Sequence, residues 1–244
     1  CEDLSIIDGG IINKGAVSEQ LGVKGMDRLS EDSITEREIS LAKRTGSPVH
    51  IAHVSTKGAI EAIRRAKSEG VPVTCETCPH YFILTEQELL KRDADYRMNP
   101  PLREESDRAA IEAAVLDGTI DCIVTDHAPH SAEEKRDFEK APNGVVGLET
   151  SLAATLTALV HTGKMDLQQL CRLMSGNPAR LLKVPGGRIS EGEVADLTIV
   201  DLGEQWTVVP EKLHSKSKNT VFKGKNLIGK VKMTLLRGNI VFED

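Results

Sequence analysis

Short apolar segments alternate with amphipathic segments along the first two thirds of the sequence. The segments predicted to be strands each follow a glycine within two positions, and they are residues 48–54, 71–77 and 120–125. The segments predicted to be helical place apolar side chains at helical spacing, and they are residues 35–44, 56–69, 104–116, 148–161 and 167–174. Strands that alternate with helices of this length form βαβ units, so we expect an α/β fold with a parallel sheet.

Polar side chains follow each predicted strand at its carboxyl end. His53, His80 and the segment 126–130 hold these positions, and a (β/α) barrel keeps its active site at this edge of the sheet. The sequence lacks the Gly-rich first turn of a dinucleotide-binding sheet, which favours the barrel. Beyond these segments, short β-type runs are separated by Gly and Asn. We therefore expect residues 1–183 to form the barrel domain and residues 184–244 to form a small β-rich domain.

The composition argues against several classes of function. A net charge of -6 disfavours nucleic-acid binding, which needs a concentrated excess of Lys and Arg. No apolar run approaches the roughly 20 residues that span a bilayer, so no membrane partner is expected. The five cysteines are scattered, and the sequence opens on the acidic Cys1-Glu2-Asp3 without a signal-peptide pattern. These features favour a protein of the reducing cytoplasm.

Asp126 is the strongest candidate for catalysis or metal binding. It directly follows an apolar strand and opens the sequence Asp-His-Ala-Pro-His, which ends at His130. A carboxylate in this place can ligate a metal or accept a proton, although an Asp after a strand also commonly caps a helix. His53 ends a strand as well and could equally be structural. His50, three residues earlier, is expected to point to the opposite face and to stay outside the site.

Three further segments carry polar or sulfur groups. No second cysteine pair accompanies Cys75 and Cys78, so we expect two buried thiols that face opposite sides. The loop from Asn99 to Arg103 contains two prolines and is expected to present an amide and a guanidinium, which would suit a cyclic amide substrate. A plain turn is the alternative for this loop. Residues 131–140 are charged and form either an active-site lid or a surface loop.

Together these segments resemble the dihydroorotases, specifically the bacterial and archaeal class related to the domain found in multifunctional pyrimidine enzymes. The most specific matches are Asn-Pro-Pro-Leu-Arg at residues 99–103 and Asp-His-Ala-Pro-His at residues 126–130. Other matching segments are residues 1–3, 51–56, 78–80, 117–121, 141–149, 195–197 and 218–229. The resemblance spans nearly the whole chain.

The resemblance implies a (β/α)8 barrel that holds one or two zinc ions and hydrolyses dihydroorotate reversibly to N-carbamoyl-aspartate in pyrimidine biosynthesis. The implied roles are zinc binding by His53, zinc binding and catalytic proton transfer by Asp126, and substrate binding by Asn99, His130, Asn143 and Gly144. The family often has Phe where this chain has Asn143. His80 is expected to lie behind the metal ligands and not among them.

Several residues that the resemblance implies are missing, and this shapes the expected activity. They are a His-x-His pair with a substrate-binding Arg on the first strand, a bridging carboxylate or modified Lys after the fourth, and a His directly before Cys1. We therefore expect the chain to hold about strands five to eight of the barrel. His53 and Asp126 are fewer than the roughly three protein ligands of a catalytic zinc. Weak or absent zinc and no measurable turnover by the chain alone are the expected result.

Half a barrel would expose unpaired edges and the interior face of strands that are expected to be apolar on both faces, and both features drive association. We therefore expect these edges to be covered by a second chain, as in a homo-oligomer, or by an N-terminal half, with a carbamoyltransferase as a further partner. Two alternatives to a dihydroorotase stay open from the sequence. One is a hydantoinase or allantoinase, which shares the barrel, the metal and the reaction type. The other is a non-catalytic dihydroorotase-like subunit.

Overall fold

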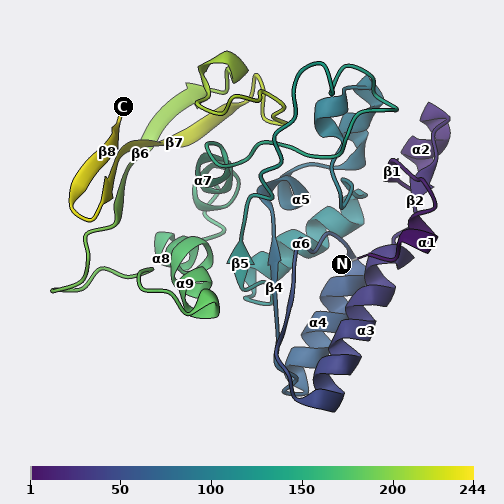
Figure 1. The fold of residues 1–244 in the computed structure, drawn as a ribbon, viewed down its shortest axis with the longest axis horizontal. Coiled ribbons are helices and arrows are strands. Elements are labelled where there is room, and N and C mark those ends of the chain that lie inside the picture. Colours follow the sequence, from purple (N-terminus) through teal and green to yellow (C-terminus); the bar gives the residue numbers. More distant parts are fainter. Residues whose placement is uncertain (1) are drawn as a thin grey trace. The chain divides into compact units, whose positions relative to one another are not determined.

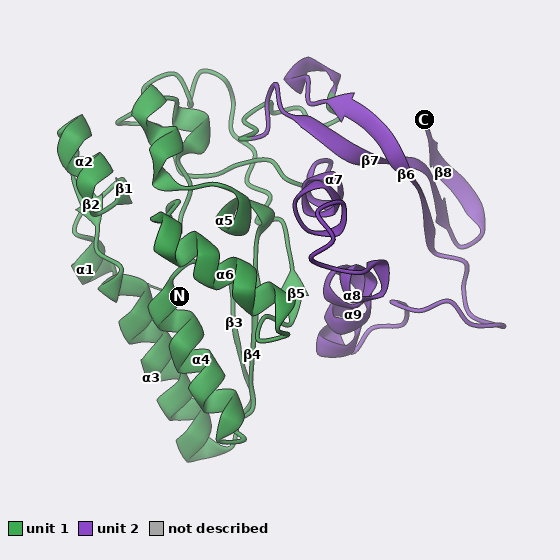
Figure 2. Cartoon of the chain, turned by 180° about the vertical axis from the view of Figure 1, so that it is seen from behind, with its two compact units in different colours: residues 1–148, 213–221 green, residues 149–212, 222–244 purple. Residues whose placement is uncertain are grey.

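The computed structural model describes residues 2–244, so the match at Cys1 lies outside the described residues. The chain divides into two compact units (Figure 2). The first, unit 1, contains residues 1–148 and 213–221, and the second, unit 2, contains residues 149–212 and 222–244. The segment 213–221 therefore returns to unit 1 after more than sixty residues of unit 2. The predicted domain boundary between residues 183 and 184 stays a prediction.

Unit 1 is an α/β structure built on parallel strands (Figure 1). Its main sheet has the order β3-β4-β5, with α4 between β3 and β4 in the chain and α6 between β4 and β5. A second, two-stranded parallel sheet is formed by β1 and β2. The strands are β1 (Ile12–Asn13), β2 (Gly25–Met26), β3 (Val49–Ile51), β4 (Val73–Thr77) and β5 (Cys122–Ile123). The α-helices are α1 (Leu4–Ile7), α2 (Ala16–Leu21), α3 (Leu29–Thr45), α4 (Lys57–Ser68), α5 (Pro79–Ile83) and α6 (Glu105–Leu116), and 3-10 turns cover Glu86–Lys91 and Ala94–Tyr96.

Helix α4 confirms the helix predicted over residues 56–69. The signals that predicted it all lie within this segment and next to it. The Thr56 hydroxyl caps the helix by accepting a hydrogen bond from the Ala59 amide at 3.2 Å. The side chains on one face are buried, and they are Ala59, Ile60, Ala62, Ile63 and Ala66. Gly70, with a φ of 75°, follows the helix in the left-handed conformation that glycine adopts most easily. Helix α3 packs beside α4 (Figure 1).

Strand β4 corrects the expectation that the sheet is apolar on both faces. Val73, Cys75 and Thr77 are buried, whereas Thr74 and Glu76 alternate with them and stay partly exposed. Since side chains alternate across a strand, one face of β4 packs into the core and the other carries polar groups. The parallel register aligns His50 of β3 with Thr74, so the polar face continues onto the neighbouring strand. The candidate site grows from this polar face.

Unit 2 contains short helical segments and a three-stranded antiparallel sheet of order β6-β7-β8. The strands are β6 (Leu197–Thr207), β7 (Asn226–Leu236) and β8 (Asn239–Glu243), and all three lie within residues 184–244. The helical segments are α7 (Ser151–Thr155), a π-helical turn at Leu156–Val160, α8 (Leu167–Cys171), a π-helical turn at Arg172–Gly176, α9 (Asn177–Leu182) and a 3-10 turn at Pro210–Lys212. Within the described residues, we find no helix with the length and apolar character needed to cross a membrane.

Candidate functional site

His53 and Asp126 come together beyond the carboxyl ends of β3 and β5. The His53 Nε2 atom lies 3.7 Å from Asp126 Oδ1, and each side chain keeps about 30% of its surface exposed (33% and 28%). Both residues have a left-handed backbone, with φ of 56° and 46°. A residue other than glycine seldom adopts this conformation, and it recurs where a side chain must be aimed at a site. The structure thus places the two predicted metal ligands side by side, while their metal-binding role stays a prediction.

Glu76 of β4 joins this pair and was missed by the sequence analysis. Its carboxylate lies 3.5 Å from His53 Nε2 through Oε1 and 3.0 Å from His50 Nε2 through Oε2. The second ring nitrogen of His50 lies 2.8 Å from the Thr74 hydroxyl. One signal in the sequence could have revealed this polar face: Thr74 and Glu76 alternate with the less polar Val73 and Cys75.

His50 therefore contradicts the expectation that it lies away from His53. That expectation assumed an extended backbone from His50 through His53, along which residues three apart point to opposite faces. Strand β3 ends at Ile51, and the positive φ of His53 interrupts the alternation. Both imidazoles consequently approach the same carboxylate of Glu76.

His53 and Asp126 fit two positions around a zinc ion but do not complete its coordination. Two ligand atoms of a tetrahedral zinc lie about 3.3 Å apart when each bond is about 2.0–2.1 Å long, and the 3.7 Å separation is close to this value. Among residues 2–244, no group of three or more His, Cys, Asp and Glu side chains is arranged to hold a metal ion. A catalytic zinc needs about three protein ligands, so this pair alone does not form a closed site.

Cys75 and Cys78 are fully buried, as the sequence predicted. The Cys75 thiol donates a hydrogen bond to the Thr119 carbonyl oxygen at 3.3 Å. Burial raises the pKa of Cys75 to about 12 and the pKa of Cys78 well above its ordinary value. Both groups are therefore protonated thiols near neutral pH, whereas a metal ligand or a nucleophile must be a thiolate.

His80 lies in the first turn of helix α5 and is buried near His53. Burial, reinforced by the nearby His53, lowers the pKa of His80 to about 3, so its imidazole is neutral at physiological pH. Its ring packs edge-on against Tyr81, with 4.2 Å between the ring centroids. The Nε2 atom has no hydrogen-bond partner among the described residues. His80 thus brings an uncharged polar group into the core behind His53.

Asn99 lies in the proline-rich loop, and its amide is held by Glu2. The Asn99 Nδ2 group donates a hydrogen bond to Glu2 Oε2. The Asn99 Oδ1 atom is buried and accepts no hydrogen bond from the described residues. An amide whose donor is engaged keeps its oxygen available as an acceptor. Asn99 therefore has an unpaired acceptor at Oδ1, which would suit the N–H group of a ring amide, and one further N–H donor at Nδ2.

Arg103, at the end of the same loop, is not presented to a ligand as the sequence suggested. Its side chain is 2% exposed and lies 3.1 Å from Glu31 Oε2, in an ion pair with that carboxylate. The guanidinium also donates to Asn13 Oδ1 at 2.9 Å and to Ser55 Oγ at 3.1 Å. Since Ser55 lies two residues beyond His53, Arg103 anchors the segment that carries His53 and takes no part in binding a substrate directly.

His130, Asn143 and Gly144 form a second cluster. His130 Nε2 lies 3.0 Å from the Asn143 carbonyl oxygen, and the Gly144 amide donates to the Arg97 carbonyl oxygen at 2.9 Å. A Cβ atom on Gly144 would stand 2.7 Å from the Ala128 Cβ and 2.9 Å from His130 Cδ2, so the close approach requires glycine. The three predicted substrate-binding residues are thus neighbours, and their roles stay predictions.

The charged segment 131–140 is fastened to unit 1 by Lys135. The buried Lys135 ammonium donates to the carbonyl oxygens of Ala94, Arg97 and Pro142 at 3.0, 3.1 and 2.9 Å. Burial lowers the pKa of this lysine to about 8. The Arg97 guanidinium adds a hydrogen bond to the Phe138 carbonyl oxygen at 2.6 Å. These bonds hold the segment against the backbone around Ala94 and Arg97, and they disfavour the interpretation as a lid.

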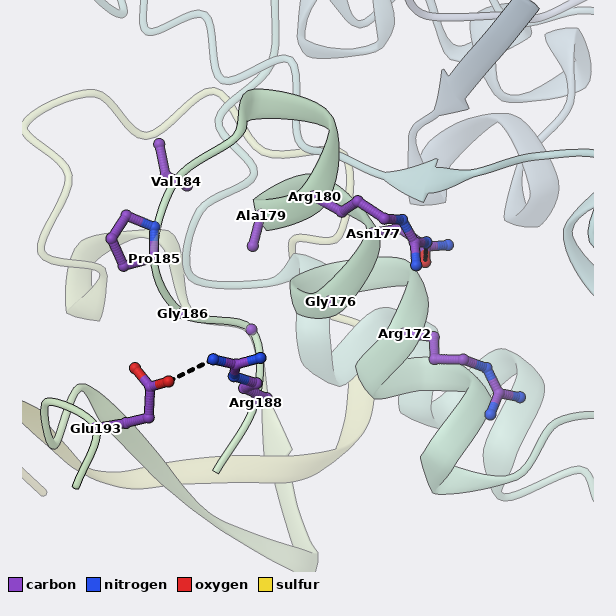
Figure 3. A pocket seen from close by; sticks show the side chains of 11 residues that line it. Arg172, Gly176, Asn177, Ala179, Arg180, Val184, Pro185, Gly186, Arg188 and Glu193 are labelled. Atoms are coloured by element: carbon purple, nitrogen blue, oxygen red, sulfur yellow. Dashed lines mark hydrogen bonds and ion pairs between the residues drawn. The ribbon is translucent and has the colours of Figure 1, made fainter. Parts of the chain in front are cut away.

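Unit 2 contains a separate pocket of about 570 Å³, lined by residues of its helical turns and of the glycine loop that follows (Figure 3). Its three arginines do not converge on a common point. Arg188 is paired with Glu193, and Arg180 donates to Asn177. The side chain of Arg172 points away from the loop that carries Val184 (Figure 3). No predicted site residue belongs to this pocket.

Residues 10–241 match the Amidohydrolase family. The chain is 50% identical over 242 residues to the dihydroorotase of Trichlorobacter lovleyi, which covers 99% of this chain and 57% of that protein. It is 46% identical over 245 residues to the dihydroorotase of Acetivibrio thermocellus, covering 100% of this chain and 58% of that protein. The chain thus spans less than two thirds of the length of these curated relatives.

Solved structures of related enzymes share the fold. The dihydropyrimidinase from Brevibacillus agri is 31% identical and superposes with a TM-score of 0.83, covering 88% of this chain and 49% of that one. The L-hydantoinase (dihydropyrimidinase) from Arthrobacter aurescens is 30% identical with a TM-score of 0.86, covering 99% of this chain and 56% of that one. From its sequence and its structure, the chain belongs to the amidohydrolase family.

Proposed function

We propose that this chain provides part of the catalytic (β/α)8 barrel of a zinc-dependent dihydroorotase. The reaction is the reversible hydrolysis of dihydroorotate to N-carbamoyl-aspartate in pyrimidine biosynthesis. The observation that carries the proposal is the approach of His53 to Asp126 at the carboxyl ends of parallel strands. Relatives that are 46–50% identical and bear the name dihydroorotase support the choice of substrate. We further propose a cytoplasmic homo-oligomer that can associate with a carbamoyltransferase.

Asp126 is proposed to carry the proton in this reaction. Hydrolysis forms a bond between a water oxygen and the ring carbonyl carbon and breaks the bond from that carbon to the ring nitrogen. One carboxylate can take the proton from the water and then deliver it to the departing nitrogen. The partial exposure of Asp126 leaves it open to a ligand, and the neighbouring His53 can stabilise its negative charge.

His53 and Asp126 are the residues of this chain that would hold zinc, and a complete site would need at least one further protein ligand. When bound, zinc polarises a carbonyl and makes water a better nucleophile at neutral pH. Glu76 faces the same Nε2 atom of His53 at 3.5 Å, so its carboxylate lies beside the position proposed for the metal and adds negative charge there. The buried, neutral His80 adds no positive charge that would oppose the binding of a cation.

The substrate is proposed to lie between Asn99 and the cluster of His130, Asn143 and Gly144. Asn99 would accept a hydrogen bond from a ring N–H through its unpaired Oδ1 atom. His130 would recognise the carboxylate, and the backbone of Asn143 and Gly144 would contact the ring. In this structure the Asn143 carbonyl oxygen already faces His130, so a bound substrate must share or replace that contact.

Two other functions are each favoured by one observation. A hydantoinase-like or allantoinase-like cyclic amidohydrolase is favoured by the TM-scores of 0.83 and 0.86 to the dihydropyrimidinase and L-hydantoinase structures. A non-catalytic dihydroorotase-like subunit is favoured by the two metal ligands, which fall short of a complete set among residues 2–244.

Co-refolding the chain with the N-terminal segment of a dihydroorotase relative tests these possibilities. Zinc retention together with turnover of dihydroorotate would support the proposed function, and turnover of hydantoin or allantoin instead would support the second candidate. Retained solubility without zinc or turnover would support the non-catalytic subunit. His130→Ala is the specificity control. It should weaken the binding of dihydroorotate but not the binding of dihydrouracil, which lacks the carboxylate.

A further inference from the structure

Asn219 connects two loops that lie far from it in the sequence. Its Nδ2 group donates to the carbonyl oxygens of Ala128 and Gly144, both at 3.1 Å. Its Oδ1 atom accepts a hydrogen bond from the His130 amide at 3.2 Å. Its own carbonyl oxygen accepts one from the Val146 amide at 3.0 Å. One residue therefore satisfies four backbone groups of the two loops.

This arrangement requires a side-chain amide. The two loops present two acceptors, the carbonyl oxygens of Ala128 and Gly144, and one donor, the His130 amide. An Asn side chain matches them, because its Nδ2 atom carries two N–H donors and its Oδ1 atom is an acceptor. Asn219 is 3% exposed, so water cannot easily replace these partners. The residue belongs to the segment 213–221, which returns to unit 1 from the later part of the chain. That return brings the amide to the two loops.

The loops that Asn219 joins carry the candidate substrate-binding groups. One loop leads from Asp126 to His130, and the other contains Gly144. The loops approach so closely that a Cβ atom on Gly144 would stand 2.9 Å from the Ala128 carbonyl oxygen. We propose that Asn219 is a positioning residue that locks these loops together and thereby sets the place of His130 relative to Gly144 for ligand binding. This inference rests on the proposed function for the identity of the ligand.

Hydrogen exchange on the 244-residue chain tests the connection between the loops. In Asn219→Ala the His130 amide loses its acceptor, so its exchange should accelerate about tenfold or more. The amides of Val54 and Val124, which donate to β4, should keep their protection because the sheet is untouched. Asn239→Ala is the matched control, since Asn239 is an exposed residue of unit 2. Unchanged exchange at His130, or equal acceleration at Val54 and Val124, would overturn the proposal.

Asn219→Asp separates positioning from a simple loss of packing. It keeps the shape and the acceptor for the His130 amide but removes both donors to Ala128 and Gly144. In the complex refolded with the N-terminal segment, we expect the His130 amide to stay protected while the affinity for dihydroorotate falls about tenfold or more, since each of the two lost hydrogen bonds corresponds to a factor of roughly two to ten. Wild-type affinity in this variant would overturn the positioning role. If the complex of the wild-type chain with the N-terminal segment binds no dihydroorotate, the proposed function fails, while the exchange data still decide whether Asn219 locks the loops.

Discussion

Replacing Arg103 with Met should destabilise unit 1 by about 3–5 kcal/mol, the usual cost of leaving one charge of a buried pair without its partner. The structure gives the reason. The side chains of Arg103 and Glu31 are 2% and 3% exposed, and the guanidinium donates to Ser55 and Asn13 as well as to Glu31. Three lost hydrogen bonds at about 1 kcal/mol each lead to a similar figure.

Urea unfolding monitored by circular dichroism measures this loss. Arg65→Met is the matched control, because Arg65 also pairs with a glutamate of α3, Glu36, but both side chains are more than half exposed (55% and 52%). An exposed pair contributes about 0–1 kcal/mol, so the control should stay close to the wild type. Arg103→Lys should fall between the two, since it keeps the charge but loses the planar fork that reaches several acceptors.

A double-mutant cycle tests whether the effect belongs to the ion pair. Glu31→Gln combined with Arg103→Met should be less destabilised than the sum of the single variants, with a coupling of about 0.5–3 kcal/mol. The reasoning would be refuted if Arg103→Met cost no more than Arg65→Met. It would also be refuted if the effects of the two buried substitutions were additive.

Four further outcomes follow from the structure. In the complex refolded with the N-terminal segment of a relative, His53→Asn or Asp126→Asn should lower the zinc retained after dialysis, measured by atomic emission, whereas Cys78→Ser should leave it unchanged because that thiol is buried and protonated. The purified 244-residue chain should show no turnover in a dihydroorotate assay, since the pair of His53 and Asp126 falls short of about three zinc ligands. The pKa of Lys135 is lowered from 10.5 to about 8 in the folded chain, so between pH 8 and 10 the unfolded chain binds more protons at this residue than the folded chain does. Urea unfolding should therefore show that the wild type gains stability relative to Lys135→Met as the pH rises through this range. Gly144→Ala should lower the free energy of unfolding by about 1–3 kcal/mol, since the added Cβ would clash with Ala128 and His130. A lower melting temperature than that of the wild type would show this loss.

The elements that the sequence predicted well are those whose signals are local. Helix α4 has its cap at Thr56, its apolar face and its closing Gly70 within fifteen residues. Strand β4 likewise follows a glycine and an apolar pattern. Strand β5 was predicted over residues 120–125 but is regular only at Cys122–Ile123, because its neighbour β4 offers it only two aligned pairs.

The side-chain partners at the site could not be predicted from spacing. Arg103 sits in a loop rich in proline, where an exposed guanidinium is the natural expectation. Its partner Glu31 is 72 positions earlier in the chain, and no local pattern indicates that the two meet. The left-handed backbone of His53 was equally hidden, since that conformation is uncommon outside glycine.

The short strands explain why such distant partners are needed. Strand β5 has only two residues, so the sheet cannot by itself orient Asp126, which lies three positions beyond it. The loop that follows is held by one backbone hydrogen bond, from the Ala128 amide to the Val145 carbonyl oxygen at 2.9 Å, and by side chains: His127 Nδ1 accepts a hydrogen bond from the Gly147 amide at 3.1 Å, and Asn219 holds the His130 amide. In the same way Arg103 holds the segment after β3 through Ser55. The segments that carry His53 and His130 are therefore each held by a polar side chain supplied by another part of the sequence, which a reading of neighbouring residues does not reveal.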